Sequence, residues 1–211
     1  MRNCLNAVAC VIAFTCIFTV SADAQSFVGA GYGTYNVPGA SSEFKGYCPT
    51  LTYEYLFDNM RQSVYTDVSF FKNDEMWQGA SEIDNMGNII REPDLQLHTT
   101  YLYGQAGAKM LLGEADERKI IPYLGAGFAF AFAKTKSSKV IAPGEMAGSE
   151  SRLLWGFHFN AGAQYNFGAL VVALRGNLDF ILKPIDYNSS SSNVLKNTRL
   201  AVLIPLSHDG Q

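Results

Sequence analysis

The sequence predicts an all-β protein, an eight-stranded antiparallel up-and-down transmembrane β-barrel. The first observation is the strand predicted at residues 121–133, where large apolar residues alternate with glycine and alanine. Neither face of that strand is charged, as a solvent-exposed face would be. The second observation is that the connections between predicted strands alternate in length, long then short. Such an alternation places all short turns at one end of a barrel and all long loops at the other.

Residues 1–24 have the features of a secretory signal peptide. Arg2 precedes an apolar stretch at residues 7–20, and Ala22 and Ala24 occupy the small-residue positions of a cleavage site. That stretch is shorter than the ~20 residues that a membrane-spanning helix needs. We therefore expect a signal peptide at residues 1–24 and one barrel domain at residues 25–211.

The rest of the chain limits the class of protein further. Its formal net charge is −3, which gives no reason to expect nucleic-acid binding. Cys48 is the only cysteine outside the predicted leader, so no internal disulfide is expected. No later stretch is apolar enough for a spanning helix, so a membrane could be crossed only by strands.

Eight segments have strand character. They are residues 26–37, 47–57, 61–71, 95–112, 121–133, 153–167, 170–180 and 198–206. Long polar loops are expected at residues 72–93, 134–150 and 183–197. In the fourth segment the apolar residues change from one face to the other, and a β-bulge near Gly104 would explain the change.

The volume of the barrel decides which face points inward. An eight-stranded barrel has an interior just wide enough for its own side chains. The large side chains of the apolar faces would overfill it, so we expect them outside: Tyr53, Tyr55, Phe57, Phe70, Phe128, Phe130, Phe132, Trp155, Phe157 and Phe159. Tyr47, Tyr103, Tyr123 and Trp155, near strand ends, fit aromatic girdles at the membrane surface or ordinary strand propensity.

The opposite faces of the strands carry charged and polar residues that would then lie in the lumen. The expected lumen network is Glu54, Asp67, Arg152, His158, Arg175 and Asp179. Buried charges persist when they are paired and hydrogen-bonded. We interpret this network as a structural plug, and an ion path through a small porin is the alternative.

The motif Pro-Tyr-Leu-Gly-Ala-Gly at residues 122–127, the glycine-rich first strand and the loop pattern resemble eight-stranded outer-membrane barrels of the OmpA, opacity-protein and porin-like surface-antigen type. The resemblance implies a monomer in the outer membrane of a Gram-negative bacterium. It also implies contact with outer-membrane lipid, and long extracellular loops that recognise an extracellular ligand or a host surface.

Catalytic and metal sites have little support in the sequence. Some small outer-membrane barrels modify lipids, so His98 deserves attention beside Ser81, Asp84, Glu92 and Asp94, but no hydrolase motif accompanies it. No cluster has the spacing of metal ligands, and no cofactor is expected. We therefore expect no enzyme. The remaining alternatives are a lipid-modifying enzyme and a soluble periplasmic, lipocalin-like binder of an apolar ligand.

Overall fold

The structure is a computed structural model of the chain. It describes residues 25–37, 45–57, 61–77, 81–83, 86, 89–91, 94–115, 119–139, 146–182 and 193–206. The predicted signal peptide at residues 1–24 lies outside this set, so its cleavage stays a prediction. Within the described residues, no helix is long and apolar enough to cross a membrane.

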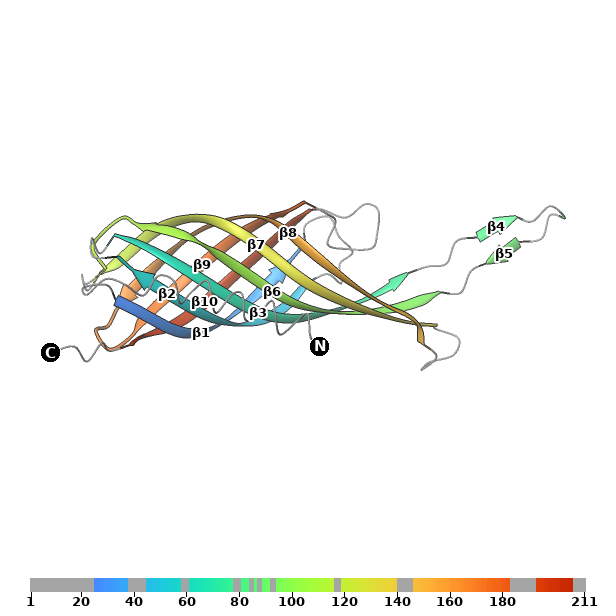
Figure 1. The fold of residues 1–211 in the computed structure, drawn as a ribbon, viewed down its shortest axis with the longest axis horizontal. Helices are drawn as coiled ribbons and strands as arrows, with labels where there is room; N and C mark the ends of the chain where they lie inside the picture. Colours follow the sequence, from blue (N-terminus) through green and yellow to red (C-terminus); the bar gives the residue numbers. More distant parts are fainter. Residues whose placement is uncertain are drawn as a thin grey trace.

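Eight strands close into one barrel, which confirms the predicted fold class (Figure 1). Their bounds are β1 Gln25–Asn36, β2 Lys45–Leu56, β3 Gln62–Trp77, β6 Leu95–Leu111, β7 Ile120–Lys139, β8 Met146–Asn166, β9 Val171–Ile181 and β10 Val194–Leu206. Each strand pairs antiparallel with both neighbours, and β1 closes the barrel by pairing with β10. Short connections lie at one end, the turn end, and long connections lie at the other, the loop end.

The turn between β8 and β9 shows how a short connection is made at the turn end. The Phe167 N–H donates to the Leu170 carbonyl at 2.9 Å. Gly168 has a φ of 89°, which glycine adopts without the steric cost that a Cβ brings. Its N–H donates to the Asn166 Oδ1 at 2.7 Å, so the turn is stabilised by both backbone and side chain.

The long polar segments contain more strand than the sequence indicated. The loop predicted at residues 72–93 was wrong in part, because β3 continues to Trp77 and a second hairpin follows. That hairpin is formed by β4 Ser81–Ile83 and β5 Ile89–Arg91.

The other two predicted loops are also shorter than expected. In the loop predicted at 134–150, β7 runs to Lys139 and β8 begins at Met146, while β10 begins at Val194 within the loop predicted at 183–197. These strand ends could not be recognised in the sequence because they consist of polar residues. Apolar residues alternate with polar ones only where one face of a strand has to be apolar. The backbone pairing continues nonetheless, and Thr99 and Thr135 hydrogen-bond across strands through their hydroxyls at 2.8 Å.

Four adjacent strands extend beyond the rest of the barrel at the loop end. Strand β3 pairs with β2 only as far as Ser69, and β8 pairs with β9 only from Gly156 onward. Beyond those points β3, β6, β7 and β8 pair only with one another, and they form a sheet that we call the projecting wall. Figure 1 shows these strands continuing past the ends of β1, β9 and β10.

The prediction of a β-bulge near Gly104 was wrong. The register of β6 is continuous past Gly104 with both neighbouring strands, and the one irregularity recorded on β7 lies between Ser137 and Ser138. Gly104 faces outward, and the ring of Phe130 covers it so closely that an added Cβ would lie 2.1 Å from the ring. The apolar stripe changes face because the interior is aromatic near one end of β6 and polar near its middle.

Two apolar clusters lie inside the barrel, one toward each end. The loop-end cluster is Tyr35, Val37, Cys48, Phe71, Tyr101, Tyr103, Ala129, Ala131, Ala133, Leu154, Ile181 and Leu195. The turn-end cluster is Phe27, Leu56, Leu111, Ala115, Ile121, Tyr123, Val171, Ala173 and Leu203. Tyr103 and Tyr123 therefore line the interior, so of the two interpretations of these residues the outer girdle does not apply to them. Trp155, Phe128, Phe157 and Phe159 are exposed on the outer face, as predicted.

Candidate functional site: the polar layer of the barrel interior

Between the two apolar clusters lies a layer of charged and polar side chains, the polar layer. Its members face inward because each occupies the inward position in the alternation of its strand. The buried charged members are Glu54, Asp67, Lys109, Arg175, Asp179 and Arg199. A buried charge needs partners in place of water, so the contacts of this layer determine whether it is stable.

One buried ion pair lies next to the turn-end cluster. Lys109 on β6 lies 2.7 Å from Glu54 Oε1 on β2, and both side chains are almost fully buried. The Lys109 Nζ donates to Gln164 Oε1 on β8 at 2.9 Å and lies 4.6 Å from the centroid of the Tyr123 ring. One ammonium group therefore links three strands and is stabilised by a carboxylate, an amide oxygen and an aromatic face.

Asp67 is the centre of the second group of contacts. Its Oδ2 pairs with Arg175 Nη1 and lies 2.9 Å from Arg199 Nη1, while the Thr52 hydroxyl donates to its Oδ1 at 2.6 Å. The Arg175 guanidinium also lies 4.5 Å from the centroid of the Tyr65 ring. Two guanidinium groups thus share one carboxylate, which is 1% exposed.

The third group of contacts surrounds His158. Its Nδ1 pairs with Asp179, and its Nε2 lies 3.0 Å from the Asn160 Nδ2. Because the Asp179 carboxylate accepts, the His158 Nδ1 donates in this pair. Gln105 donates to both oxygens of Asp179, at 3.0 and 2.8 Å, and accepts from Arg199 Nη2 at 3.1 Å. Gln105 thereby connects the Asp179 group with the Asp67 group.

The lysine and arginine side chains of the polar layer equal its carboxylates in number. Lys109, Arg175 and Arg199 supply the cations and Glu54, Asp67 and Asp179 supply the anions. Balanced, mutually hydrogen-bonded charges in a closed space have the character of a structural core.

Of the six residues predicted for the lumen network, the structure brings five together: Glu54, Asp67, His158, Arg175 and Asp179. Arg152 shares the inward face of β8, but Leu154 of the loop-end cluster lies between it and His158 along the strand. Arg152 therefore belongs to the loop-end side of that cluster, outside the polar layer. Side-chain alternation predicts the face of a strand correctly and carries no information on height along the barrel.

Three important members of the layer were missed. Lys109 and Gln105 lie on β6, where the expected bulge obscured which residues face inward. Arg199 lies on β10, on the face opposite Leu200, Val202 and Ile204. That alternation was visible in the sequence and could have identified Arg199 as a lumen residue.

His98, the residue considered for catalysis, lies on the outer face of the projecting wall. Its Nδ1 hydrogen-bonds to Asp74 at 2.7 Å, and both side chains are exposed. Within the described residues no serine, threonine or cysteine bonds to the other ring nitrogen of His98. Nucleophilic catalysis needs such a partner. The described residues also contain no group of histidine, cysteine and carboxylate side chains that could hold a metal.

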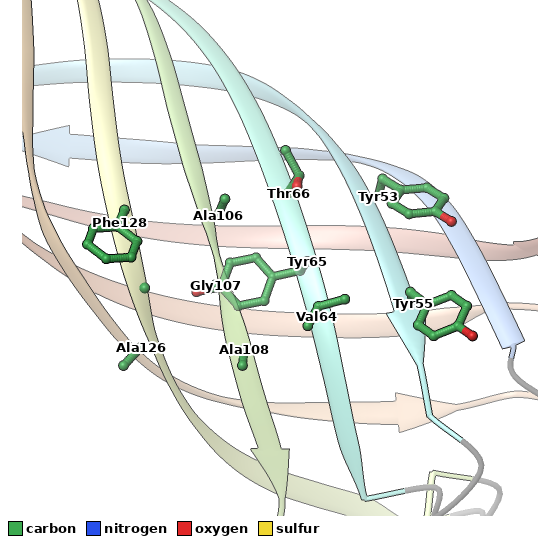
Figure 2. Close-up of a pocket in the computed structure, with 11 residues that line it drawn as sticks. Tyr53, Tyr55, Val64, Tyr65, Thr66, Ala106, Gly107, Ala108, Ala126 and Phe128 are labelled. Atoms are coloured by element: carbon green, nitrogen blue, oxygen red, sulfur yellow. The ribbon is translucent and has the colours of Figure 1, made fainter. Parts of the chain in front are cut away.

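An apolar groove of about 360 Å³ crosses the outer wall of the barrel. Figure 2 shows Tyr53 and Tyr55 along one side, Phe128 at the other, and Ala106 and Ala108 between them. The small residues of β6 and β7 create the hollow, and none of the lining residues is charged. The groove therefore has the chemistry of a hydrocarbon-facing surface.

Comparison with known proteins places this architecture. The sequence matches the family described as outer membrane protein beta-barrel domain over residues 8–199. A major outer membrane protein from Thermus thermophilus is similar in structure, with a TM-score of 0.62, 12% identity, and coverage of 87% of this chain and 99% of that chain. At such an identity the similarity shows the fold alone.

Two further solved structures are similar with lower scores. The attachment invasion locus protein Ail of Yersinia pestis has a TM-score of 0.48 and 15% identity, and covers 87% of this chain and 97% of its own. Neisserial surface protein A has a TM-score of 0.47 and 14% identity, with the same coverage of 87% and 97%. A search of curated proteins found no match.

Proposed function

Because the chain belongs to the outer membrane protein β-barrel domain family, we propose that it is a closed, non-conducting barrel that presents its loop end as an interaction surface. Family membership places the protein in the outer membrane. The finer role, recognition of a partner through the loop end, is the proposal. Loops on a rigid scaffold commonly carry recognition. The partner would be an extracellular ligand or a host surface.

The observation that carries the proposal is the filled interior. The polar layer is bounded on both sides by an apolar cluster, and its charges are engaged with one another. Among the described residues, the cavity beside Glu54 and Gln164 has a volume of about 10 Å³, which is room for about one water. Hydrated ions and apolar ligands need far more space, and ligand sites typically have ~300–1,000 Å³. The filled interior therefore argues against both the small-porin and the lipocalin-like alternatives.

The absence of catalytic activity remains an expectation. His98 with Asp74 is half of a catalytic arrangement, and the described residues add no nucleophile to it. A lipid-modifying activity would have to show itself as release of acyl chains or headgroups from outer-membrane lipid by the refolded protein.

Conductance is the property that tests the proposal. We expect refolded protein in planar lipid bilayers to show no large, steady open state in single-channel recordings. Insertion is checked separately, by the faster mobility of an unheated sample on gels and by protease resistance, so that a silent bilayer cannot result from missing protein. Large, steady currents from the unmodified, inserted protein would contradict the closed barrel and establish the small porin instead.

A further inference from the structure

The outer face of the projecting wall changes from apolar to basic within one row of residues. The row Phe70, Leu102, Phe132 and Leu153 runs across β3, β6, β7 and β8 in direct register. The next row toward the tip is Lys72, Thr100, Lys134 and Ser151, and the one after it is Asp74, His98, Lys136 and Ser149. Lysines thus begin where the apolar surface ends.

Lys72, Lys134 and Lys136, which we call the lysine triad, are exposed on this face. None of them forms an ion pair with any residue that the structure describes, whereas Asp74, the acidic residue in these two rows, is engaged with His98. The Lys72 Nζ lies over the Phe70 ring, 6.0 Å from its centroid, so this ammonium group is directly beside the apolar row.

The spacing of the triad suits one phosphate group or two linked ones. Neighbouring strands are ~4.8 Å apart, so the backbones of Lys72 and Lys134, with β6 between them, are about 10 Å apart. Lys134 and Lys136 are two residues apart on β7, which is ~7 Å. Flexible four-carbon stems let three ammonium groups at these spacings converge on one anion, and lysine binds phosphate as a point charge.

The described residues at the turn end of the barrel do not repeat this arrangement. At the turn end, Arg61 lies 3.0 Å from Glu114, so that cation has a counter-charge. The charge of the lysine triad therefore belongs to one face at one end of the molecule. The triad lies immediately beyond the apolar row, at the level expected for the headgroups of membrane lipids.

We propose that the lysine triad binds the phosphate groups of a phosphorylated lipid in the leaflet at the loop end. The apolar row would contact the acyl chains of that lipid, and Thr100 and Ser151 offer hydroxyls within the same row as two of the lysines. The triad would fix the height and rotation of the projecting wall relative to the membrane surface. This proposal does not depend on whether the lumen conducts.

The test measures binding of bisphosphorylated lipid A to the refolded full chain in phosphatidylcholine nanodiscs by native mass spectrometry. We expect binding to exceed that of the same lipid without its phosphates. The double variant Lys134→Gln/Lys136→Gln should lose roughly tenfold or more in affinity, because each lysine near a charged surface contributes appreciably. Gel mobility of unheated samples confirms that each variant is folded.

A matched control separates a site from general attraction. Lys45→Gln/Lys196→Gln removes the same charge at the same end, from β2 and β10, where both lysines are exposed on another side of the barrel. We expect this variant to retain affinity within about twofold. Equal losses in both double variants would overturn the site. Inorganic pyrophosphate that displaced the lipid at equal concentration would also overturn it, by making the site one for free phosphate.

Discussion

At the scale of single residues, the polar layer acts as one unit because each charge in it depends on a neighbour for its stability. Asp67 forms ion pairs with Arg175 and Arg199 together, and Gln105 joins this group to Asp179. Removing one member leaves an opposite charge buried without water. Such a loss costs more than the pair itself contributes, since the desolvation of the remaining ion is no longer offset.

Lys109→Met tests this dependence. The variant removes the ammonium group and leaves Glu54 buried at 3% exposure without its ion pair. We expect the free energy of unfolding to fall by ~3–5 kcal/mol, the cost of breaking a buried pair from one side. Urea unfolding in lipid vesicles, followed by tryptophan fluorescence, measures the change.

The companion variant is Lys109→Met/Glu54→Gln, in which neither charge remains. We expect it to regain a substantial part of the lost stability, because a neutral amide is far cheaper to bury than a lone carboxylate. Lys45→Met, at an exposed position, should change the stability by less than ~0.5 kcal/mol. A double variant no more stable than the single one would show that packing around the Lys109 side chain, and not charge, holds this part of the layer.

The residue scale also shows what alternation alone can predict. Alternation placed Glu54, Asp67 and Arg175 in the lumen correctly, because every second residue of a strand points to the same face. It grouped Arg152 with them wrongly, since parity is the same at every height of a strand. Contacts within the layer depend on register between strands distant in sequence, such as Asp67 and Arg175, and no single strand contains that information.

At the scale of elements, strand interiors were predictable and strand ends were not. Where the outer face is apolar, one face of each strand meets lipid and the other meets a crowded interior, so large apolar residues alternate with small or polar ones and the strand is recognisable in the sequence. Beyond that part neither face has to be apolar, and residues such as Thr135 and Ser137 continue β7 without an alternating apolar pattern. The prediction of a bulge in β6 failed for a related reason. Tyr101 and Tyr103 belong to the loop-end cluster inside the barrel, but in the sequence they resemble an outward-facing apolar surface.

Phe128→Arg tests the outward face of β7. Phe128 is 59% exposed and lies midway along the apolar outer positions of that strand. An arginine facing lipid near the membrane midplane is expected to cost ~2–4 kcal/mol. Folding into phosphatidylcholine vesicles, scored by gel mobility, measures the loss, with Phe128→Leu as the control that keeps the position apolar. Equal folding of both variants would mean that this face does not meet hydrocarbon.

At the scale of the whole molecule, the projecting wall makes the two ends of the barrel unequal. All long connections and the β4–β5 hairpin lie at the loop end, and the turn end holds only short connections (Figure 1). We expect the loop end to face the outside of the cell, as outer-membrane barrels keep their longer loops extracellular.

Cysteine labelling tests this orientation. Gly148→Cys at the loop end should react with an impermeant maleimide in intact cells, whereas Glu114→Cys at the turn end should react only after lysis. Both positions are exposed, so access to the reagent differs only by the side of the membrane. The native Cys48 is buried in the loop-end cluster and serves as the background. Labelling of the turn-end cysteine alone in intact cells would reverse the orientation.

The pairing of β1 with β10 affects how the barrel folds. Phe27 lies opposite Pro205, so the seam that closes the barrel joins residues from the two ends of the strand order. Contacts this distant in sequence make folding slow, because a long loop must be ordered before the contact forms. Arg199 also arrives with β10, so Asp67 lacks one of its partners until the last strand is present. A nascent chain short of β10 would carry two open strand edges, which invite aggregation. Because closure needs β10, we expect it to be a late step in the folding of the barrel.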